Sequence, residues 1–363
     1  MNRYLFIINT YYQLIMALQM RQTIFFEDEV VVFISDKSRN AEHIYQKLLE
    51  GVYFTAVKFI QEDNSLRKPG IIDKVKKLIE NVRPKKNRYR KYFDGIENLR
   101  FDEIISFNVD LMTYNFYSIL YEYNRDLKYS GFEEGLLSYN AQLLDIHKGS
   151  LICKTRNLFG KKSFVQAYKN FYCFFPQLYK GGFTAVKVPA ITRNSHIIKA
   201  LQRIFEVQVF SNHYTQKYIF FSSVYDFEGG SPIGEFEVVK RIALKVGKEN
   251  LLIKLHPRDF RTIYEENGFV IDSYSAIPWE VIQLTGEFSD KVFLTATSGS
   301  VLAGSFMASS STKVFYLYRL CNIEGNEFCV RSVENIETLL RAESMEETFR
   351  NVTIADSVEE IIQ

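Results

Sequence analysis

The 363-residue chain lacks an excess of either charge, with 45 Lys and Arg residues against 43 Asp and Glu and a net charge of +2. Nucleic-acid binding relies on clustered positive charge, so this balance gives no support for a nucleic-acid partner. The chain also lacks a long apolar run, because Asn9, Thr10, Gln13 and Gln19 interrupt the segment 4–20. No small-residue cleavage site follows it, so we expect no signal peptide and a cytoplasmic protein.

Cysteines are few, and their spacing is irregular. Cys153, Cys173, Cys321 and Cys329 form no Cys-x-x-Cys pair, so we expect reduced thiols rather than zinc ligands or a disulfide framework. The sequence also contains neither an Asp-x-Asp pair nor a cluster of His and Cys. Such groups are the usual cation ligands, so their lack predicts that the protein requires no metal and no cofactor.

Apolar residues are plentiful, at 47% of the sequence with 15% aromatic. This content and the length predict two buried cores, and therefore two domains. Short apolar runs alternate with amphipathic stretches, which is typical of α/β domains with mostly parallel sheets. In the first half we expect strands at 4–8, 30–34, 103–107 and just before 132, and helices at 11–20, 71–82 and 109–123. In the second half we expect strands at 218–221, 251–255, 292–295 and 314–317, and helices at 234–246 and 301–307.

A stretch without a clear strand, residues 187–215, separates the two alternating halves. We therefore predict a first domain over residues 1–190, an interdomain crossing over 191–215 and a second domain over 216–363. Ligands of open α/β sheets bind at the edge formed by the carboxyl ends of the strands. Polar residues that directly follow predicted strands are consequently the candidates for a functional site.

The clearest candidate follows the apolar run Leu251–Leu255, which ends at His256 and Pro257. A proline cannot continue a central strand, so the histidine is expected at the strand's carboxyl end. An imidazole with an ordinary pKa of about 6.5 can carry a proton at neutral pH and act as a general acid. A histidine that only caps the strand or bonds the backbone is the alternative.

A second candidate is the segment Ser298-Gly299-Ser300, between the predicted strand at 292–295 and the predicted helix at 301–307. Serine hydroxyls and free backbone N–H groups at a helix start can bind a phosphate, and Gly299 permits close backbone approach. Ordinary capping of the helix by Ser298 or Ser300 is the alternative, and it does not exclude anion binding.

Acidic and amide side chains follow predicted strands of the first half. The segment Glu133-Glu134-Gly135 carries two adjacent carboxylates, which in a cleft raise one another's pKa. Asn9, Thr10 and Gln13 follow the first strand, where they would bind hydroxyl or carboxylate groups of a sugar. For Asn9 and Thr10, capping of the first helix is the alternative.

Five segments together resemble a known family: Asn9-Thr10-Tyr11-Tyr12-Gln13, Phe132-Glu133-Glu134-Gly135 with Ser138-Tyr139, Phe221-Ser222-Ser223-Val224-Tyr225-Asp226, Leu255-His256-Pro257-Arg258 and Ser298-Gly299-Ser300. They are similar to segments of the bacterial sialyltransferases of glycosyltransferase family 52, which include enzymes that sialylate lipooligosaccharide. The resemblance implies a GT-B-like fold of two Rossmann-like domains whose parallel sheets face a central cleft. It also implies CMP-sialic acid as donor, inversion of the anomeric centre and no metal in the transfer.

The resemblance further implies roles for single residues. The first domain would lie on the acceptor side, where Gly135 would contact substrate, and the second domain would bind the donor. His256 would assist departure of the CMP phosphate, with Ser222, Pro257 and the segment 298–300 as binding residues. Glu280 resembles a position that contacts the donor nucleotide, and its alternative is a first-turn glutamate favoured by the helix dipole.

Two regions of the sequence offer candidates for the residue that deprotonates the acceptor hydroxyl. The resemblance to family 52 favours Asp226 as this catalytic base, with Glu228 as the alternative if the loop carries one extra residue. A related sialyltransferase family uses an acidic-acidic-glycine motif in its first domain, which makes Glu133 and Glu134 the other candidates. We expect Asp226 to be the base and the two glutamates to shape the donor or acceptor side.

A basic cluster occupies the stretch 74–91, interleaved with aromatic residues: Lys74, Lys76, Lys77, Arg83, Lys85, Lys86, Arg88, Arg90 and Lys91. It would dock on anionic lipid at the inner face of the cytoplasmic membrane or hold an anionic saccharide. A solvated surface is the alternative.

These observations predict an inverting sialyltransferase that transfers sialic acid from CMP-sialic acid to a galactose-terminated bacterial surface glycan, lipooligosaccharide or capsule. Its partners would be the nucleotide-sugar donor and an oligosaccharide acceptor, with a homodimer as an open option. A relative that uses another nucleotide sugar, and a non-catalytic glycan- or nucleotide-binding protein of the same fold, are the alternatives.

Overall fold

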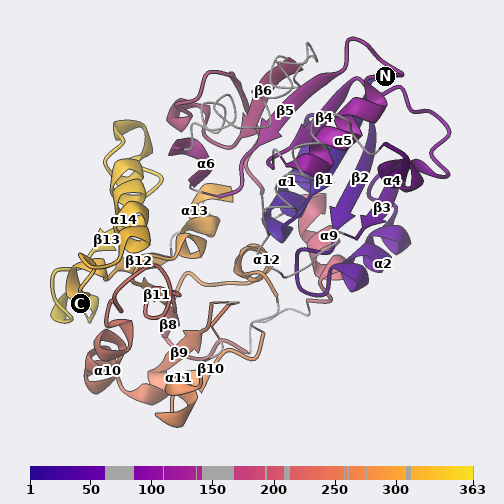
Figure 1. Ribbon diagram of the computed structural model, residues 1–363. Helices are drawn as coiled ribbons and strands as arrows, with labels where there is room; N and C mark the ends of the chain where they lie inside the picture. The colour runs from indigo at the N-terminus through magenta and orange to yellow at the C-terminus, as the bar shows by residue number, and fades with distance from the viewer. Residues whose placement is uncertain are drawn as a thin grey trace, which may run out of the picture. The chain divides into compact units, whose positions relative to one another are not determined.

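The computed structural model divides the chain into two compact units, Met1–Pro189 and Ala190–Gln363 (Figure 1). It describes all residues except 62–85, 109, 136, 141–166, 193, 208–212, 257, 260, 275–276, 308–311 and 363. The expected helix at 71–82, Cys153 and Pro257 therefore lie outside the described residues. Cys173, Cys321 and Cys329 are free thiols. No helix in the described part is long and apolar enough to cross a membrane.

The first unit is built on a seven-stranded sheet in which every pair of neighbours is parallel, in the order β3-β2-β1-β4-β5-β6-β7. Its strands are β1 (Arg3–Ile8), β2 (Glu29–Ser35), β3 (Ala56–Ile60), β4 (Glu103–Ser106), β5 (Lys128–Phe132), β6 (Tyr168–Cys173) and β7 (Thr184–Lys187). Its helices are α1 (Tyr11–Thr23), α2 (Ala41–Gly51), α4 (Lys86–Arg90), α5 (Leu111–Leu120) and α6 (Leu137–Asn140), with the 3-10 helices η1 (Lys91–Phe93) and η3 (Pro176–Leu178).

Both faces of the first sheet are covered by apolar side chains, because alternate residues of each strand point to opposite faces. On one face, Leu5 and Phe33 belong to a core that includes most of α5, and the rings of Phe33 and Phe116 lie 5.1 Å apart. On the other face, Phe6 packs against Phe25, which follows α1, at 5.9 Å. Strands that are buried on both faces have continuous apolar sequences, which is why β1 and β2 could be predicted from the sequence.

The second unit is built on a six-stranded parallel sheet in the order β10-β9-β8-β11-β12-β13. Its strands are β8 (Tyr218–Phe221), β9 (Leu251–Lys254), β10 (Val270–Ile271), β11 (Val292–Thr295), β12 (Lys313–Tyr316) and β13 (Val352–Ile354). Its helices are α9 (His196–Ile204), α10 (Glu235–Val246), α11 (Ile263–Glu266), α12 (Trp279–Thr285), α13 (Ala303–Met307) and α14 (Glu327–Leu340). Short 3-10 helices are η5 (Lys248–Asn250), η6 (Gly299–Leu302), η7 (Tyr318–Leu320), η8 (Glu343–Met345) and η9 (Glu359–Ile361).

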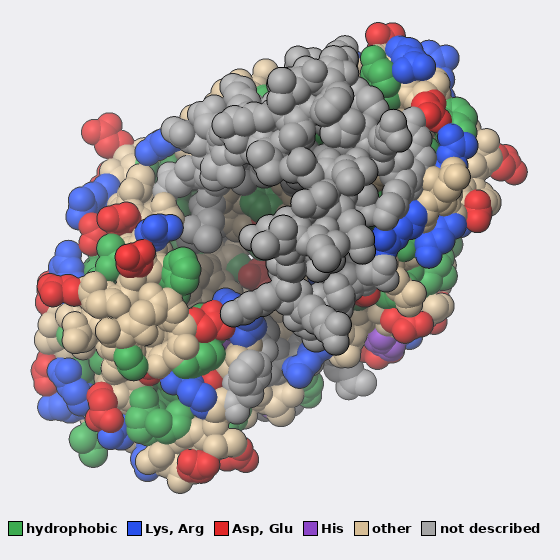
Figure 2. All heavy atoms as spheres, viewed as in Figure 1, with side chains coloured by type: hydrophobic (Ala, Val, Ile, Leu, Met, Phe, Trp, Pro, Cys, Tyr) green, Lys and Arg blue, Asp and Glu red, His purple; other side chains and the backbone are tan. Residues whose placement is uncertain are grey.

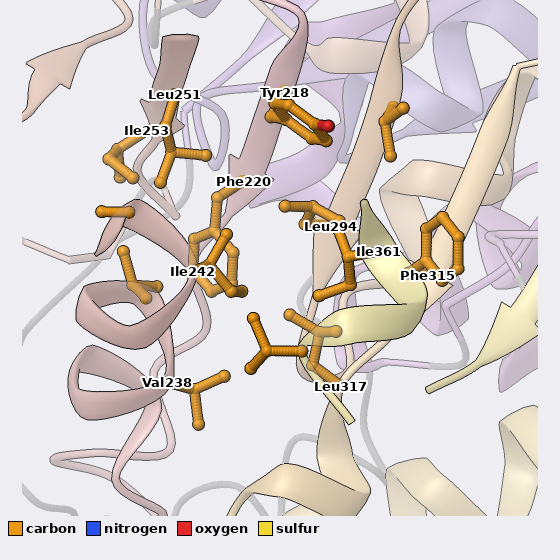
Figure 3. Packing of buried hydrophobic residues seen from close by; sticks show 14 of the residues in the cluster. Tyr218, Phe220, Val238, Ile242, Leu251, Ile253, Leu294, Phe315, Leu317 and Ile361 are labelled. Carbon is orange, nitrogen blue, oxygen red and sulfur yellow. The ribbon is translucent and has the colours of Figure 1, made fainter. Parts of the chain in front are cut away.

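The core of the second unit also lies on two faces of its sheet. Figure 3 shows one face, where side chains of β8, β9 and β11 such as Phe220 meet Val238 and Ile242 of α10. On the opposite face, Trp279 of α12 packs edge-on against Phe221 at 4.7 Å and against Phe293 at 5.3 Å. Helices on both faces of a parallel sheet give each unit a doubly wound α/β architecture.

The α/β class with parallel sheets is confirmed, and the predicted strands correspond to β1, β2, β4, β5, β8, β9, β11 and β12. The sequence prediction missed β3, β6, β7, β10 and β13. It also described 187–215 as a crossing, whereas this stretch contains α9, whose apolar residues are buried in the second unit. The expected helix at 301–307 is instead η6 followed by the short α13.

Candidate functional site

In the second unit, three strands end side by side. Phe221 of β8 is in register with Lys254 of β9 and with Thr295 of β11. From β8 the chain adds β9 and β10 on one side of the sheet, and then β11, β12 and β13 on the other side. Parallel α/β sheets bind ligands at such a switch point, outside the carboxyl ends of the strands. The fold therefore brings the loops that carry Ser222, His256 and the segment 298–300 to one edge.

His256 is held in a defined orientation at this edge. Its backbone N–H donates to Ser222 Oγ at 2.9 Å, and its Nδ1 accepts the backbone N–H of Arg258 at 3.1 Å. A neutral imidazole that accepts at Nδ1 carries its proton on Nε2. Burial and the charge of Arg258 lower the pKa of His256, while Glu228 and Asp259 oppose the shift. At neutral pH the side chain therefore presents an Nε2–H donor without a positive charge.

The hydroxyls of Ser222 and Ser298, two other donor-side candidates, differ in their hydrogen bonds within the protein. Ser222 is only 2% exposed and its hydroxyl binds the His256 peptide, so we assign it a positioning role instead of the expected contact with substrate. Ser298 precedes η6, and its side chain makes no capping hydrogen bond. Its backbone N–H donates to Thr295 Oγ1 at 2.9 Å. The hydroxyl of Ser298 is thus not used to cap the helix.

Glu280 lies in the first turn of α12, close to groups from two other segments. Burial raises the pKa of Glu280, while its own backbone N–H, the charge of Lys254 and the Ser300 hydroxyl oppose the shift. The structure therefore brings Glu280 and Ser300 together, as a donor site would require. Lys254 is itself buried and paired with Asp272, with Nζ 3.0 Å from Oδ2.

The carboxylate of Asp226 is bound by groups of the protein. Its Oδ1 accepts the backbone N–H groups of Gly234 and Glu235 at 2.9 and 3.3 Å, at the start of α10, and its Oδ2 lies 3.4 Å from Arg261 Nη1. Both carboxylate oxygens of Asp226 are therefore directed to groups of the protein. Glu228, the alternative in this loop, forms an ion pair with Arg258 at 2.7 Å.

In the first unit, Glu133 is fully buried just beyond β5. Its carboxylate accepts the hydroxyls of Tyr12 and Tyr139 and the backbone N–H of Phe174, the last at 2.9 Å. Burial raises the pKa of Glu133 to about 7, although these three donors oppose the shift. Glu133 therefore ties α1, α6 and the end of β6 to one another, with its oxygens directed to protein groups.

Glu134, the next residue, is partly exposed. Its backbone N–H donates to Ser138 Oγ at 2.6 Å, and Gly135 follows with a φ of +73° that suits glycine. Burial raises the pKa of Glu134, while Thr10, Gln13 and the charge of Lys37 oppose the shift. A carboxylate with a raised pKa and access to solvent can accept a proton from a ligand.

Thr10 and Gln13 lie beside this glutamate, and Asn9 precedes them at the carboxyl edge of β1. Thr10 caps α1, since its side chain accepts the Gln13 backbone N–H at 3.3 Å. The Asn9 N–H donates to Gln13 Oε1 at 2.7 Å, which fixes the orientation of the Gln13 amide. The Asn9 Nδ2 is buried and has no hydrogen-bond partner among the described residues. A buried donor of this kind fits a hydroxyl or carboxylate oxygen of a ligand.

Sequence reasoning missed Tyr12 and Tyr139, although both occur in quoted segments, and it missed Glu235, Asp259 and Arg261. Glu235 is 1% exposed, and both of its oxygens accept the Ser223 N–H, at 3.0 and 3.1 Å. Burial raises the pKa of Glu235 to about 7, with Asp226 adding to the shift and the Ser223 bonds and Arg261 opposing it. Several of these contacts join segments distant in sequence, such as Tyr12 with Glu133 and Arg261 with Asp226, and a local pattern cannot predict them. Among the described residues, no group of three or more His, Cys, Asp or Glu is arranged to hold a metal ion.

The two buried glutamates predict how stability depends on pH. The pKa values of Glu133 and Glu235 rise to about 7 from an ordinary 4.5, so their contribution is fully present below about pH 4.5 and is lost as the pH rises through about 7. Each shift corresponds to on the order of 3 kcal/mol at most. We expect Glu133→Gln and Glu235→Gln to gain melting temperature relative to the unsubstituted protein between pH 5 and pH 8. Parallel melting curves at all pH values would contradict this expectation.

Comparison with known proteins shows the family of the chain. The sequence model for alpha-2,8-polysialyltransferases matches residues 4–293, a range that contains Glu134, Asp226 and His256. A search of curated proteins finds no match. The matched range is more than half of the chain, so it shows the family. It does not confirm the resemblance to glycosyltransferase family 52.

Several solved structures are similar to this chain. An alpha/beta-galactoside alpha-2,3-sialyltransferase from the luminous marine bacterium Photobacterium phosphoreum is 12% identical, with 99% of each chain covered and a TM-score of 0.50. A UDP-GlcNAc 2-epimerase from Neisseria meningitidis is 12% identical over 99% of this chain and 89% of that chain, with a TM-score of 0.44. UGT89C1 from Arabidopsis thaliana is 9% identical over 99% and 88%, with a TM-score of 0.48. The fold is GT-B-like, and the chain belongs to the alpha-2,8-polysialyltransferase family of glycosyltransferases.

Proposed function

We propose that the protein is an inverting sialyltransferase that transfers sialic acid from CMP-sialic acid to a galactose-terminated bacterial surface glycan, either lipooligosaccharide or capsule. The family supports a glycosyltransferase that acts in sialylation. The single observation that carries the proposal is His256, whose Nε2–H is presented at the switch point of the second sheet. The likeness of five segments to family 52 supports CMP-sialic acid as the donor.

On the donor side, the bond between the anomeric carbon and the phosphate oxygen breaks, and CMP leaves. His256 donates a hydrogen bond from Nε2 to that oxygen and so stabilises the negative charge that develops on the departing phosphate, while the proton stays on the imidazole. Ser298, Gly299 and Ser300 bind the phosphate through hydroxyl and N–H groups. Glu280 accepts hydrogen bonds from the nucleotide.

On the acceptor side, the attacking hydroxyl gives its proton to a carboxylate. The contacts of Asp226 favour the alternative assignment, in which Glu134 is the base, because Glu134 is partly exposed and burial raises its pKa. The acceptor oxygen then bonds to the anomeric carbon from the face opposite the phosphate, which inverts the configuration. Asn9, Thr10 and Gln13 bind sugar hydroxyl or carboxylate groups beside Glu134.

Transfer to a terminal sialic acid in alpha-2,8 linkage is the second candidate, and the description of the matching family favours it. A donor other than CMP-sialic acid is the third. Hydrolysis of CMP-sialic acid and of UDP-sugars, followed by transfer to galactose-terminated and sialic-acid-terminated oligosaccharides, separates these options. Turnover of UDP-sugars alone would refute CMP-sialic acid as the donor, and CMP binding without turnover would point to a non-catalytic protein.

We predict that activity is independent of divalent metal. His256 and the hydroxyl and N–H groups of the segment 298–300 can bind a phosphate monoester leaving group without a cation. Transfer measured in excess EDTA should therefore match transfer measured with added magnesium. Loss of activity in EDTA that magnesium or manganese restores would instead favour a nucleotide-diphosphate donor.

We also propose peripheral contact with anionic membranes through the basic stretch 74–91, of which residues 74–85 lie outside the described residues. In the described part, Lys91 lies over the ring of Tyr92 at 5.0 Å and Arg90 pairs with Glu122 at 2.7 Å. On the face that Figure 2 shows, basic and acidic side chains are mixed, so such contact would need a local basic stretch. Each basic residue near an anionic membrane contributes about 1 kcal/mol. Failure to sediment with anionic vesicles at low salt would refute this contact.

A further inference from the structure

In the loop that follows β9, backbone and side-chain hydrogen bonds hold His256 in place. The backbone N–H of His256 donates to Ser222 Oγ at 2.9 Å, and its carbonyl accepts the backbone N–H of Asp259 at 2.8 Å. Its Nδ1 accepts the backbone N–H of Arg258 at 3.1 Å. The tautomer and the direction of the imidazole therefore depend on where the peptide groups of residues 258 and 259 lie.

Asp259 anchors this loop from inside the second unit. Its side chain has no exposed surface, and Arg261 binds it in a two-point contact, with Nη2 2.7 Å from Oδ2 and Nε 2.9 Å from Oδ1. The backbone N–H of Arg261 also donates to Oδ1 at 3.1 Å, and the Ser222 hydroxyl lies 3.4 Å from Oδ2. A two-point arginine–carboxylate contact fixes geometry as well as charge.

Arg261 links the loop to a second element. Its Nη1 lies 3.4 Å from Asp226 Oδ2, while Asp226 Oδ1 accepts N–H groups at the start of α10. The guanidinium also lies 4.6 Å from the centre of the Phe227 ring. A chain of contacts thus runs from α10 through Asp226, Arg261 and Asp259 to the peptide groups that orient His256.

We propose that Asp259 and Arg261 are positioning residues for His256, and that Asp226 acts through them rather than by accepting a proton. The proposal rests on the role of His256 given under the proposed function. Its physical basis is that a displacement of about 1 Å in a reacting group can lower a rate by about 100-fold. Neither residue reaches the substrate in this account, so their effect depends on the presence of the imidazole.

A double-mutant cycle in the full-length protein tests this dependence. Arg261→Ala should lower kcat by roughly 10- to 100-fold, with CMP binding changed less than about twofold. In a His256→Ala background, the same substitution should change kcat by less than about twofold. Arg261→Lys keeps the charge but not the planar fork, so it should fail to restore activity. If Arg261→Ala lowers kcat by the same factor with and without His256, the two substitutions act independently and the proposal is overturned.

The control is Arg319→Ala, which removes another arginine–aspartate pair of the second unit, Arg319 with Asp356 at 2.8 Å, far from His256 in sequence. It should leave kcat unchanged. If Arg261→Ala does not fold, Asp259→Asn and Arg261→Lys take its place, and NMR of ring-labelled histidine reports the tautomer directly. A mixture of tautomers in these variants is expected, and an unchanged Nε2–H tautomer would overturn the proposal. Wild-type activity of His256→Ala alone would instead refute the proposed function.

Discussion

Replacement of His256 by alanine should lower the rate of sialic acid transfer by about 100-fold or more while the protein stays folded. The substitution removes the Nε2–H that would stabilise the departing phosphate, and no other imidazole is available from the loop after β9. The backbone N–H of residue 256 still donates to Ser222, so the fold should tolerate the change. The measurement is kcat for transfer, with melting temperature and CMP binding on the same samples.

A matched control and a second substitution make this prediction specific. His196, the first residue of α9, is exposed in the same unit, and His196→Ala should transfer at the normal rate. His256→Gln retains an amide donor near the position of Nε2, so it should keep more activity than alanine if hydrogen bonding dominates. Equal loss in both variants would contradict hydrogen bonding from Nε2 as the role of His256. Normal activity of His256→Ala would remove the residue from the mechanism.

The sequence predicted the central strands well and the edge strands poorly. Strands β1, β2, β8 and β11 are covered on both faces and appear as uninterrupted apolar runs. Four of the five missed strands, β3, β7, β10 and β13, are the outer strands of the two sheets. Their burial is partial, as in β7, whose residues are all at least partly exposed, so polar residues interrupt the pattern.

The candidate site was predictable where side chains follow strands and unpredictable where they meet across loops. His256 directly follows a predicted strand and Glu134 lies two residues beyond another, and parallel topology alone places such residues at a binding edge. Asp226 was expected to be the base from the family resemblance, and its contact with Arg261 is not visible in the sequence because Arg261 lies 35 positions further along the chain. No sequence motif indicates that Tyr12 and Tyr139 donate to Glu133, or that Arg261 lies between Asp226 and Asp259.

Substitution of the base should abolish transfer, and we expect that residue to be Glu134. Glu134→Gln keeps the size of the side chain and its hydrogen bonding but removes the proton acceptor, so kcat should fall by about 100-fold or more while CMP binding changes little. Its neighbour provides the matched control, since Glu133→Gln changes an equal side chain whose oxygens are bound to Tyr12, Tyr139 and Phe174. We expect a smaller loss for Glu133→Gln.

Asp226→Asn separates the two assignments of the base. Asparagine retains an oxygen that can accept the N–H groups of Gly234 and Glu235, so the start of α10 should persist. Only the charge that faces Arg261 disappears, and with it part of the orientation of His256. We therefore expect a moderate loss of kcat for Asp226→Asn, smaller than that for Glu134→Gln. A complete loss with Asp226→Asn, together with an active Glu134→Gln, would return the base to the second unit, because a positioning residue cannot be more essential than the proton acceptor.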